Sequence, residues 1–295
     1  GLPGWRQSAY NIRQFKKQYR KVQKLKHSTS KDEEKREAKA QQIREAHEVY
    51  LQQAEGYLQR AKDTRRRLHE ECAIAWAAMD KLHDYIAHAE RQIDQVRRRV
   101  LWGERIPHDE KVFSIFQPHT EGISKGKAGV PVELGLKVCI LEDAMRFILH
   151  HEVMQKQRDE QIAVRMVTEG QARFPGLRRV SMDKGFHSPL NQIELKQHLD
   201  KLVLPKKGRL SQADKQRESD PEFIRLRHQH SAVESAINAL EAHGLDQCPD
   251  HGIDGFKRYV SLAVLARNIQ RLGVVVLGQE KEREKRKRGP YKKAA

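Results

Sequence analysis

The first part of the chain carries apolar residues at the three- and four-residue spacing of an α-helix. Ser30 followed by Glu33 fits a capping box that starts a second helix after a polar interruption. In that helix, apolar positions alternate steps of four and three from Ala54 to Val100, which is typical of a coiled-coil seam. A continuous helix over this stretch would be roughly 70 Å long. We therefore expect residues 1–103 to form a long helical coiled-coil hairpin or arm.

Beyond residue 103 the periodicity changes from that of a helix to that of strands. Alternating or continuous short apolar runs predict strands, and a longer amphipathic run predicts a helix. The expected strands are 112–117, 132–141, 147–153, 178–182 and 202–205, and the expected helices are 159–173 and Pro189–Leu199. The first three strands, joined by short connections, suggest an antiparallel meander. Residues 104–278 therefore predict an α/β (α+β) domain with a mixed sheet flanked by helices.

Two further helices and a basic tail complete the pattern. A helix from Asp220 to Gly244 is expected to pack Phe223, Ile237 and other apolar residues on the sheet. A heavily apolar helix over 255–272 is expected to complete the core. Residues 279–295, which include KEREKRKRGPYKK, read as a disordered basic tail that binds nucleic acid nonspecifically.

Composition then narrows the class of partner. The chain has 57 Lys and Arg residues against 40 Asp and Glu residues, a net charge of +17, so a polyanion is the leading expectation. A generally basic soluble protein would have the same charge. Three scattered cysteines indicate a reducing cytosol rather than a disulfide framework. The start of the sequence lacks the apolar stretch of a signal peptide, so we expect a cytoplasmic protein with no membrane partner.

One acidic residue stands where ligands usually bind in such folds. Asp183 follows the predicted strand 178–182, and Gly185 lets the backbone turn sharply after it. Asp before Lys-Gly is also ordinary turn chemistry. The helix from Asp220 adds Glu234 at the border of its apolar face. Two carboxylates of this kind can share a pair of Mg²⁺ (or Mn²⁺) ions for phosphoryl transfer, although a third acid is normally needed.

Two weaker sets of residues accompany these acids. Basic loop residues that flank the expected site can hold DNA phosphates or remain solvated, and they are Lys125, Lys127, Lys206, Lys207 and Arg209. Histidines at 228, 230, 243 and 251 and Cys248 lack the regular spacing of a structural zinc site. The basic side chains of the helical region either lie along DNA or face solvent.

Several linked blocks of the sequence resemble one family. MDKGFHSPLN, LVLPKKGRLS, RHQHSAVESAINALEAHGL and DQCPDHGIDGFKRYVSLAVLARNIQRLG are similar to the C-terminal half of bacterial insertion-sequence DDE transposases, especially those of the ISNCY type. SIFQPHTEGISKGKAGVPVELGLKV resembles the stretch that precedes their second Asp. The resemblance is strong over residues 103–275 and looser over the helical region.

The resemblance implies a ribonuclease H-like catalytic domain over residues 104–278. Asp183 matches the second Asp of the Asp, Asp, Glu triad, and Glu234 matches the Glu; together they would bind two Mg²⁺ ions as metal ligands and catalytic residues. The implied substrate is double-stranded DNA at transposon ends and target, handled by a homodimer near the bacterial nucleoid.

One member of the triad is not matched. The family's first Asp lies on a strand upstream of the long helices, and we expect the chain to lack that strand and to have little activity alone. Glu121 or Glu133 is a less favoured substitute. The alternative from another class is a noncatalytic coiled-coil protein that binds DNA or acts as a scaffold.

Overall fold

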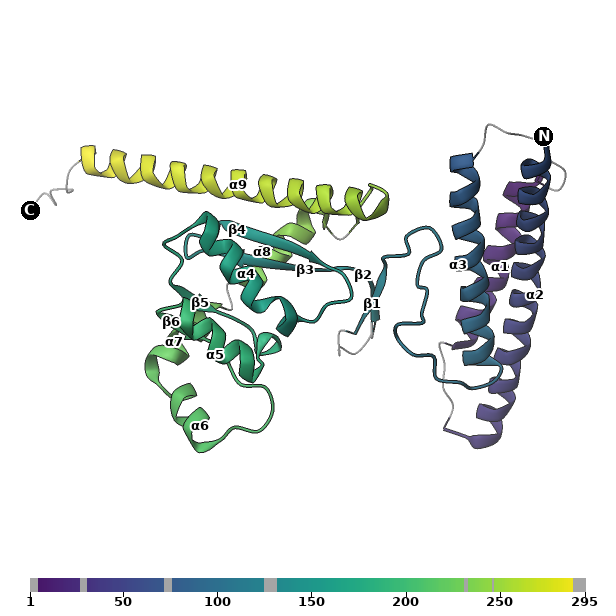
Figure 1. Ribbon diagram of the computed structural model, residues 1–295, viewed down its shortest axis with the longest axis horizontal. Helices are drawn as coiled ribbons and strands as arrows, with labels where there is room; N and C mark the ends of the chain where they lie inside the picture. Colours follow the sequence, from purple (N-terminus) through teal and green to yellow (C-terminus); the bar gives the residue numbers. More distant parts are fainter. Residues whose placement is uncertain are drawn as a thin grey trace, which may run out of the picture. The chain divides into compact units, whose positions relative to one another are not determined.

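The computed structural model describes residues 5–26, 31–71, 76–124, 132–230, 233–245 and 247–288, with the side chains of 69–71, 76–78, 233–234 and 288 left out (Figure 1). The chain divides into two compact units, Gly1–Gly122 and Ile123–Ala295, called unit 1 and unit 2 below. The predicted boundary at residue 103 therefore lies inside unit 1.

The described residues of unit 1 form three helices: α1 (Ser8–Lys26), α2 (Glu33–Glu71) and α3 (Trp76–Val100). Lys62 of α2 pairs with Glu90 of α3, and Glu55 pairs with Arg97. Because the α2 partner moves back along the chain as the α3 partner moves forward, the two helices are antiparallel. The continuous 70 Å helix predicted for this stretch is therefore wrong, and its apolar series is shared between two helices that face each other.

Aromatic side chains join α1 to α2. The Phe15 and Tyr50 rings lie 4.7 Å apart between centroids, and the Tyr57 hydroxyl donates a 3.2 Å hydrogen bond to the Asn11 carbonyl. Offset and tilted ring pairs of this kind add stability beyond the area that they bury. The predicted capping residue Ser30 lies outside the described residues, and α2 begins at Glu33, two residues after the start that the box predicted.

The segment after α3 turns back along that helix. The strand predicted at 112–117 is wrong, because α3 side chains take the backbone bonds that a neighbouring strand would supply. The Gln95 amide accepts from Val112 N at 2.9 Å and donates to Val112 O at 2.8 Å. The His88 ring lies 3.3 Å from the Ile115 carbonyl. Both backbone groups of Val112 are thus satisfied without a sheet.

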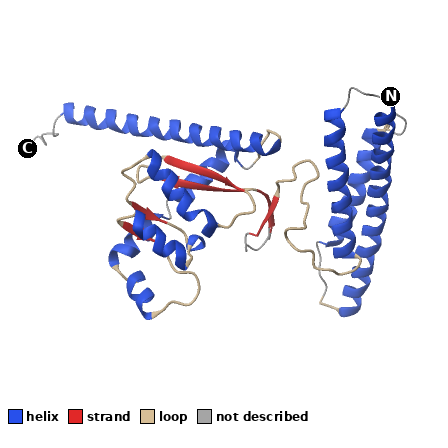
Figure 2. Cartoon of the chain, viewed as in Figure 1, coloured by secondary structure: helices blue, strands red, loops and turns tan. Residues whose placement is uncertain are grey.

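The strands, of which β1 begins at the end of unit 1 and the others lie in unit 2, pair two by two within the described residues (Figure 2). The pairs are β1 (Glu121–Ser124) with β2 (Val132–Gly135), β3 (Lys137–Glu142) with β4 (Ile148–Met154), and β5 (Arg179–Ser181) with β6 (Lys201–Val203). The β3–β4 ladder is antiparallel and the β5–β6 ladder is parallel. The predicted strand 132–141 is divided at Leu136. The architecture is helix-rich and compatible with α+β, and the described strands form three pairs in place of the mixed sheet that was predicted.

Helix α4 (Asp159–Arg173) packs against two of these strand pairs and contributes buried side chains to the core of each. Its Ala163 and Val167 pack with Val180 and Leu195 in a cluster around β5 and β6. Ile162 and Met166, from the same helix, pack with Met154 and with Cys139 and Leu141 of β3. One helix thus covers both ladders although no strand pairing joins them. Its bounds match the predicted helix, because its apolar stripe is decided by local spacing.

Helix α5 (Pro189–His198) confirms its predicted start. The Ser188 hydroxyl accepts from Asn191 N at 3.0 Å, and Pro189 occupies the first helical position, where its missing N–H costs nothing. The next helices in the described residues are α6 (Gln212–Glu218), α7 (Pro221–His230) and α8 (Val233–Leu240). The helix predicted from Asp220 to Gly244 is described as α7 and α8, and residues 231–232 between them lie outside the described residues; Ala236 and Leu240 are buried, whereas Ile237 is exposed.

Helix α9 (Gly252–Arg288) closes the other face of β3 and β4. The Asn268 amide accepts from Ile148 N and donates to Ile148 O, both at 2.9 Å, while Val264 packs with Ile148 and Leu240. Its C-terminal part continues past the strands (Figure 1). Several apolar side chains of the helix that was expected to complete the core are exposed: Leu262, Leu265, Ile269 and Leu272.

The same helix bears on two other expectations. Residues 279–288, expected as disordered tail, continue α9, and Lys285 pairs with Glu282 one turn earlier at 3.0 Å, which supports a solvated helix. By length and composition α9 is also, among the described helices, the one able to cross a bilayer. A single helix of this kind is weak evidence and is compatible with a soluble protein.

Candidate functional site

The parallel β5–β6 pair brings two loops to one edge. Arg179 pairs with Lys201 and Ser181 with Val203, and the ladder continues with Met182 N donating to Val203 O at 2.9 Å. Because parallel strands end on the same side, residues 183–187 after β5 and 205–207 after β6 lie at a shared edge. We call this the β5–β6 carboxyl edge, and Asp183 lies on it as the sequence predicted.

A short turn fixes the backbone after Asp183. Residues Lys184–Phe186 form the 3₁₀ helix η1, with Asp183 extended at its start. Buried Asn191 donates from its amide to Glu160 O at 2.7 Å and to Phe186 O at 2.8 Å, so it ties η1 to α4 and α5. A Cβ on Gly185 would stand 2.7 Å from Asp159 Oδ2, so the Asp159 carboxylate lies directly against this turn. The loop is therefore held by the buried Asn191 contacts and by α4 packing over it.

The Asp183 carboxylate is paired but open to solvent. Its Oδ1 lies 3.1 Å from Nε2 of His230, the last residue of α7, and 76% of its side chain is exposed. The hydrogen bond from His230 holds the pKa of Asp183 below its ordinary value, and the partial burial of the group opposes that shift. Asp183 therefore offers an ionised, accessible carboxylate with one fixed partner. His230 was considered from sequence only as a zinc ligand.

Glu234 lies in the first turn of α8, four residues after His230. Its side chain is outside the described residues, so its position relative to Asp183 stays a prediction. The Asp183–His230 contact nevertheless brings the end of α7, the element that immediately precedes α8 in sequence, to the β5–β6 carboxyl edge.

The basic residues predicted to hold DNA differ from one another. Lys206 Nζ pairs with Asp214 and its backbone N donates to Glu218 Oε1 at 2.7 Å, so this lysine anchors α6. The hydrogen bond from Lys206 also holds the pKa of Asp214 far below its ordinary value. Lys207 and Arg209 are exposed on the loop after β6. Lys125 and Lys127 lie outside the described residues.

The fit of this edge to a metal ion can be judged from its donors. Mg²⁺ requires several oxygen ligands in near-octahedral geometry. In the described part of the chain, no three His, Cys, Asp or Glu residues are grouped closely enough to hold a metal, which includes the histidines and cysteine considered for zinc. Glu121 and Glu133 lie on the separate β1–β2 pair. The described side chains therefore do not fit a magnesium ion by themselves.

One acid near the edge was missed from sequence. Asp159 begins α4, lies against Gly185 and accepts a 3.3 Å hydrogen bond from Lys137 Nζ. Its position depends on how α4 packs over η1, a tertiary contact without a local sequence signal.

Comparison with known proteins finds no match for this chain. The chain matches no family model, no curated protein and no solved structure.

Proposed function

We propose that the chain is a DNA-processing protein of the DDE transposase type, with the β5–β6 carboxyl edge facing the phosphate backbone. The observation that supports this most is the exposed Asp183 carboxylate at the end of a parallel strand, hydrogen-bonded to the helix that precedes Glu234. The net charge of +17 favours a polyanionic substrate.

The finer parts of the proposal follow from the family resemblance. A ribonuclease H-like arrangement agrees with the order of elements from β3 to α8 and with the single helix α4 over both ladders. Asp183 and Glu234 are proposed as catalytic ligands of Mg²⁺ or Mn²⁺, double-stranded DNA as the partner, a homodimer as the assembly, and the cytoplasm and nucleoid as the location.

Metal binding at Asp183 gives a direct test. We expect Mn²⁺ to raise the melting temperature of unit 2, since a ligand at a hundred times its Kd stabilises by about 2.7 kcal/mol. Asp183→Asn removes the proposed ligand and is expected to abolish the rise. Asp200→Asn is the matched control, because Asp200 is exposed at the opposite, amino-terminal end of β6. An equal rise in both variants would contradict a metal at this edge.

A noncatalytic DNA-binding or scaffolding protein is the second candidate. The antiparallel helices of unit 1, joined by ion pairs, favour it. Glu234→Gln separates the two functions: a metal-induced rise that persists in this variant supports the scaffold, and its loss supports the transposase.

A further inference from the structure

Unit 1 contains a cavity lined by cations. Its volume is about 520 Å³, and its charged wall consists of Lys26 from α1, Arg99 from α3, and Arg105 and Lys111 from the segment after α3. No Asp or Glu contributes to the described lining. Four positive side chains from three parts of the chain therefore converge on one hollow without a neutralising carboxylate.

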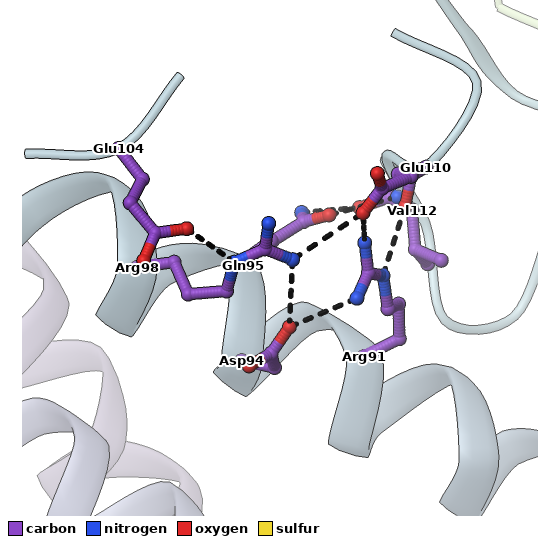
Figure 3. A network of polar contacts seen from close by, with 7 residues as sticks. All are labelled: Arg91, Asp94, Gln95, Arg98, Glu104, Glu110 and Val112. Carbon is purple, nitrogen blue, oxygen red and sulfur yellow. Dashed lines mark hydrogen bonds and ion pairs between the residues drawn. The ribbon is translucent and has the colours of Figure 1, made fainter. Parts of the chain in front are cut away.

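The carboxylates close to Arg105 and Lys111 in sequence form ion pairs with other arginines. Arg98 binds Glu104, Glu110 and Asp94, and Arg91 also binds Glu110 and Asp94 (Figure 3). Glu104 and Glu110 belong to the segment that carries Arg105 and Lys111, and both pair with arginines of α3. Because the network occupies these acids, the cations of the cavity make no ion pair within the described residues.

The same network shapes the wall of the cavity. Gln95 lines the cavity and also clamps both backbone groups of Val112, as Figure 3 shows from close by. Arg98 holds Glu104 at 2.7 Å, one residue before Arg105. The segment that carries Arg105 and Lys111 is therefore fastened to α3 at both ends, which places these cations before any ligand arrives.

A buried imidazole adds one ring nitrogen that has no hydrogen-bond partner in the described part of the chain. His47 of α2 lines the cavity and is only 3% exposed. Its Nδ1 lies 2.6 Å from the Ile43 carbonyl and donates to it, which leaves Nε2 with no partner in the described part of the chain. Burial lowers the pKa of His47, and the nearby charge of Lys26 lowers it further. A bound dianion would oppose this shift and raise the pKa of His47, because its negative charge stabilises the protonated ring.

We propose that this cavity is a phosphate-binding site in which Arg99, Arg105, Lys111 and Lys26 surround the anion and His47 donates to it from Nε2. Guanidinium groups bind phosphate oxygens through paired, charge-assisted hydrogen bonds. The phosphate group can belong to the DNA backbone or to a free phosphorylated small molecule. The site is independent of the β5–β6 carboxyl edge and does not depend on the function proposed for it.

The first test is a titration of the full chain with inorganic phosphate at constant ionic strength. The imidazole NMR signal of His47, assigned from its loss in His47→Gln, is expected to shift and saturate. Arg99→Gln with Arg105→Gln is expected to weaken binding about tenfold or more. The control is Arg36→Gln with Arg67→Gln, which removes the same charge from exposed positions of α2 that do not line the cavity and lie several turns from His47. An unsaturated shift, or equal weakening in both double variants, would overturn the site.

The second test distinguishes the two sources of phosphate. A short DNA duplex is titrated into the same three proteins at several salt concentrations. If the backbone is the ligand, the cavity variant lowers the slope of log affinity against log salt by about 0.9 for each lost phosphate contact, and the control does not. If a free phosphorylated molecule is the ligand, phosphate binding is lost while both double variants bind DNA equally.

Discussion

The packing of α4 predicts that the two ladders of unit 2 unfold together. Ile162 is fully buried against Met154 and Met166, on the side of α4 that meets β3 and β4. Val167 is fully buried on the side that meets β5 and β6. Truncating Ile162 to alanine is therefore expected to weaken both ladders, because they share this one helix.

The size of the effect follows from burial. An Ile side chain with no exposed surface loses its transfer free energy and leaves a cavity, which costs roughly 4 kcal/mol. This is a large share of the roughly 5–15 kcal/mol that stabilises a typical domain. For a unit of this length the melting temperature is expected to fall by about 10 °C.

Amide hydrogen exchange measures the coupling between the two ladders, and thermal and urea unfolding measure the loss of stability. In Ile162→Ala, protection is expected to fall equally in β3–β4 and in β5–β6. Leu51→Ala, at a residue that is 2% exposed in unit 1, is the control and should leave unit 2 protection unchanged. Loss of protection confined to β3–β4 would refute the view that α4 couples the two ladders.

Three further outcomes follow from individual residues. His230→Gln should raise the pKa of Asp183, which carboxyl ¹³C NMR measures. Because the pKa of Asp183 is depressed in the folded state, the His230–Asp183 pair stabilises the fold above about pH 4. This stabilisation is lost as the pH falls through the folded pKa. Burial, with the nearby negative charges, raises the pKa of Cys139 to about 12, so at pH 8 iodoacetamide should label its peptide far more slowly than in urea. Gly244→Ala places a side chain at a φ of 98° and should cost about 1–2 kcal/mol in urea unfolding.

Elements governed by local signals were predictable from sequence. The bounds of α4 came from its apolar stripe, and the start of α5 from Ser188 and Pro189. Asp183 was located because a glycine turn follows a short apolar run. In each case a few neighbouring residues determine the conformation.

Elements governed by distant contacts were not. Residues 112–117 have strand-like alternation, yet Gln95 and His88 of α3 take their backbone bonds. The seam through Ala54 suits one long helix or two facing helices equally, and periodicity alone does not choose between them. Similarly, Lys206 and Arg209 look alike in sequence, and only the fold pairs Lys206 with Asp214.

The central claim is that the β5–β6 carboxyl edge faces DNA, and a tethered cleavage reagent tests it most directly. An iron chelate is attached at Lys184→Cys or, as the control, at Asp200→Cys, in a chain whose three natural cysteines are replaced. Both positions are exposed, but they lie at opposite ends of the β5–β6 pair. We predict cleavage of bound duplex DNA from position 184 and little from position 200. Equal cleavage from both, or cleavage from position 200 alone, would contradict the account.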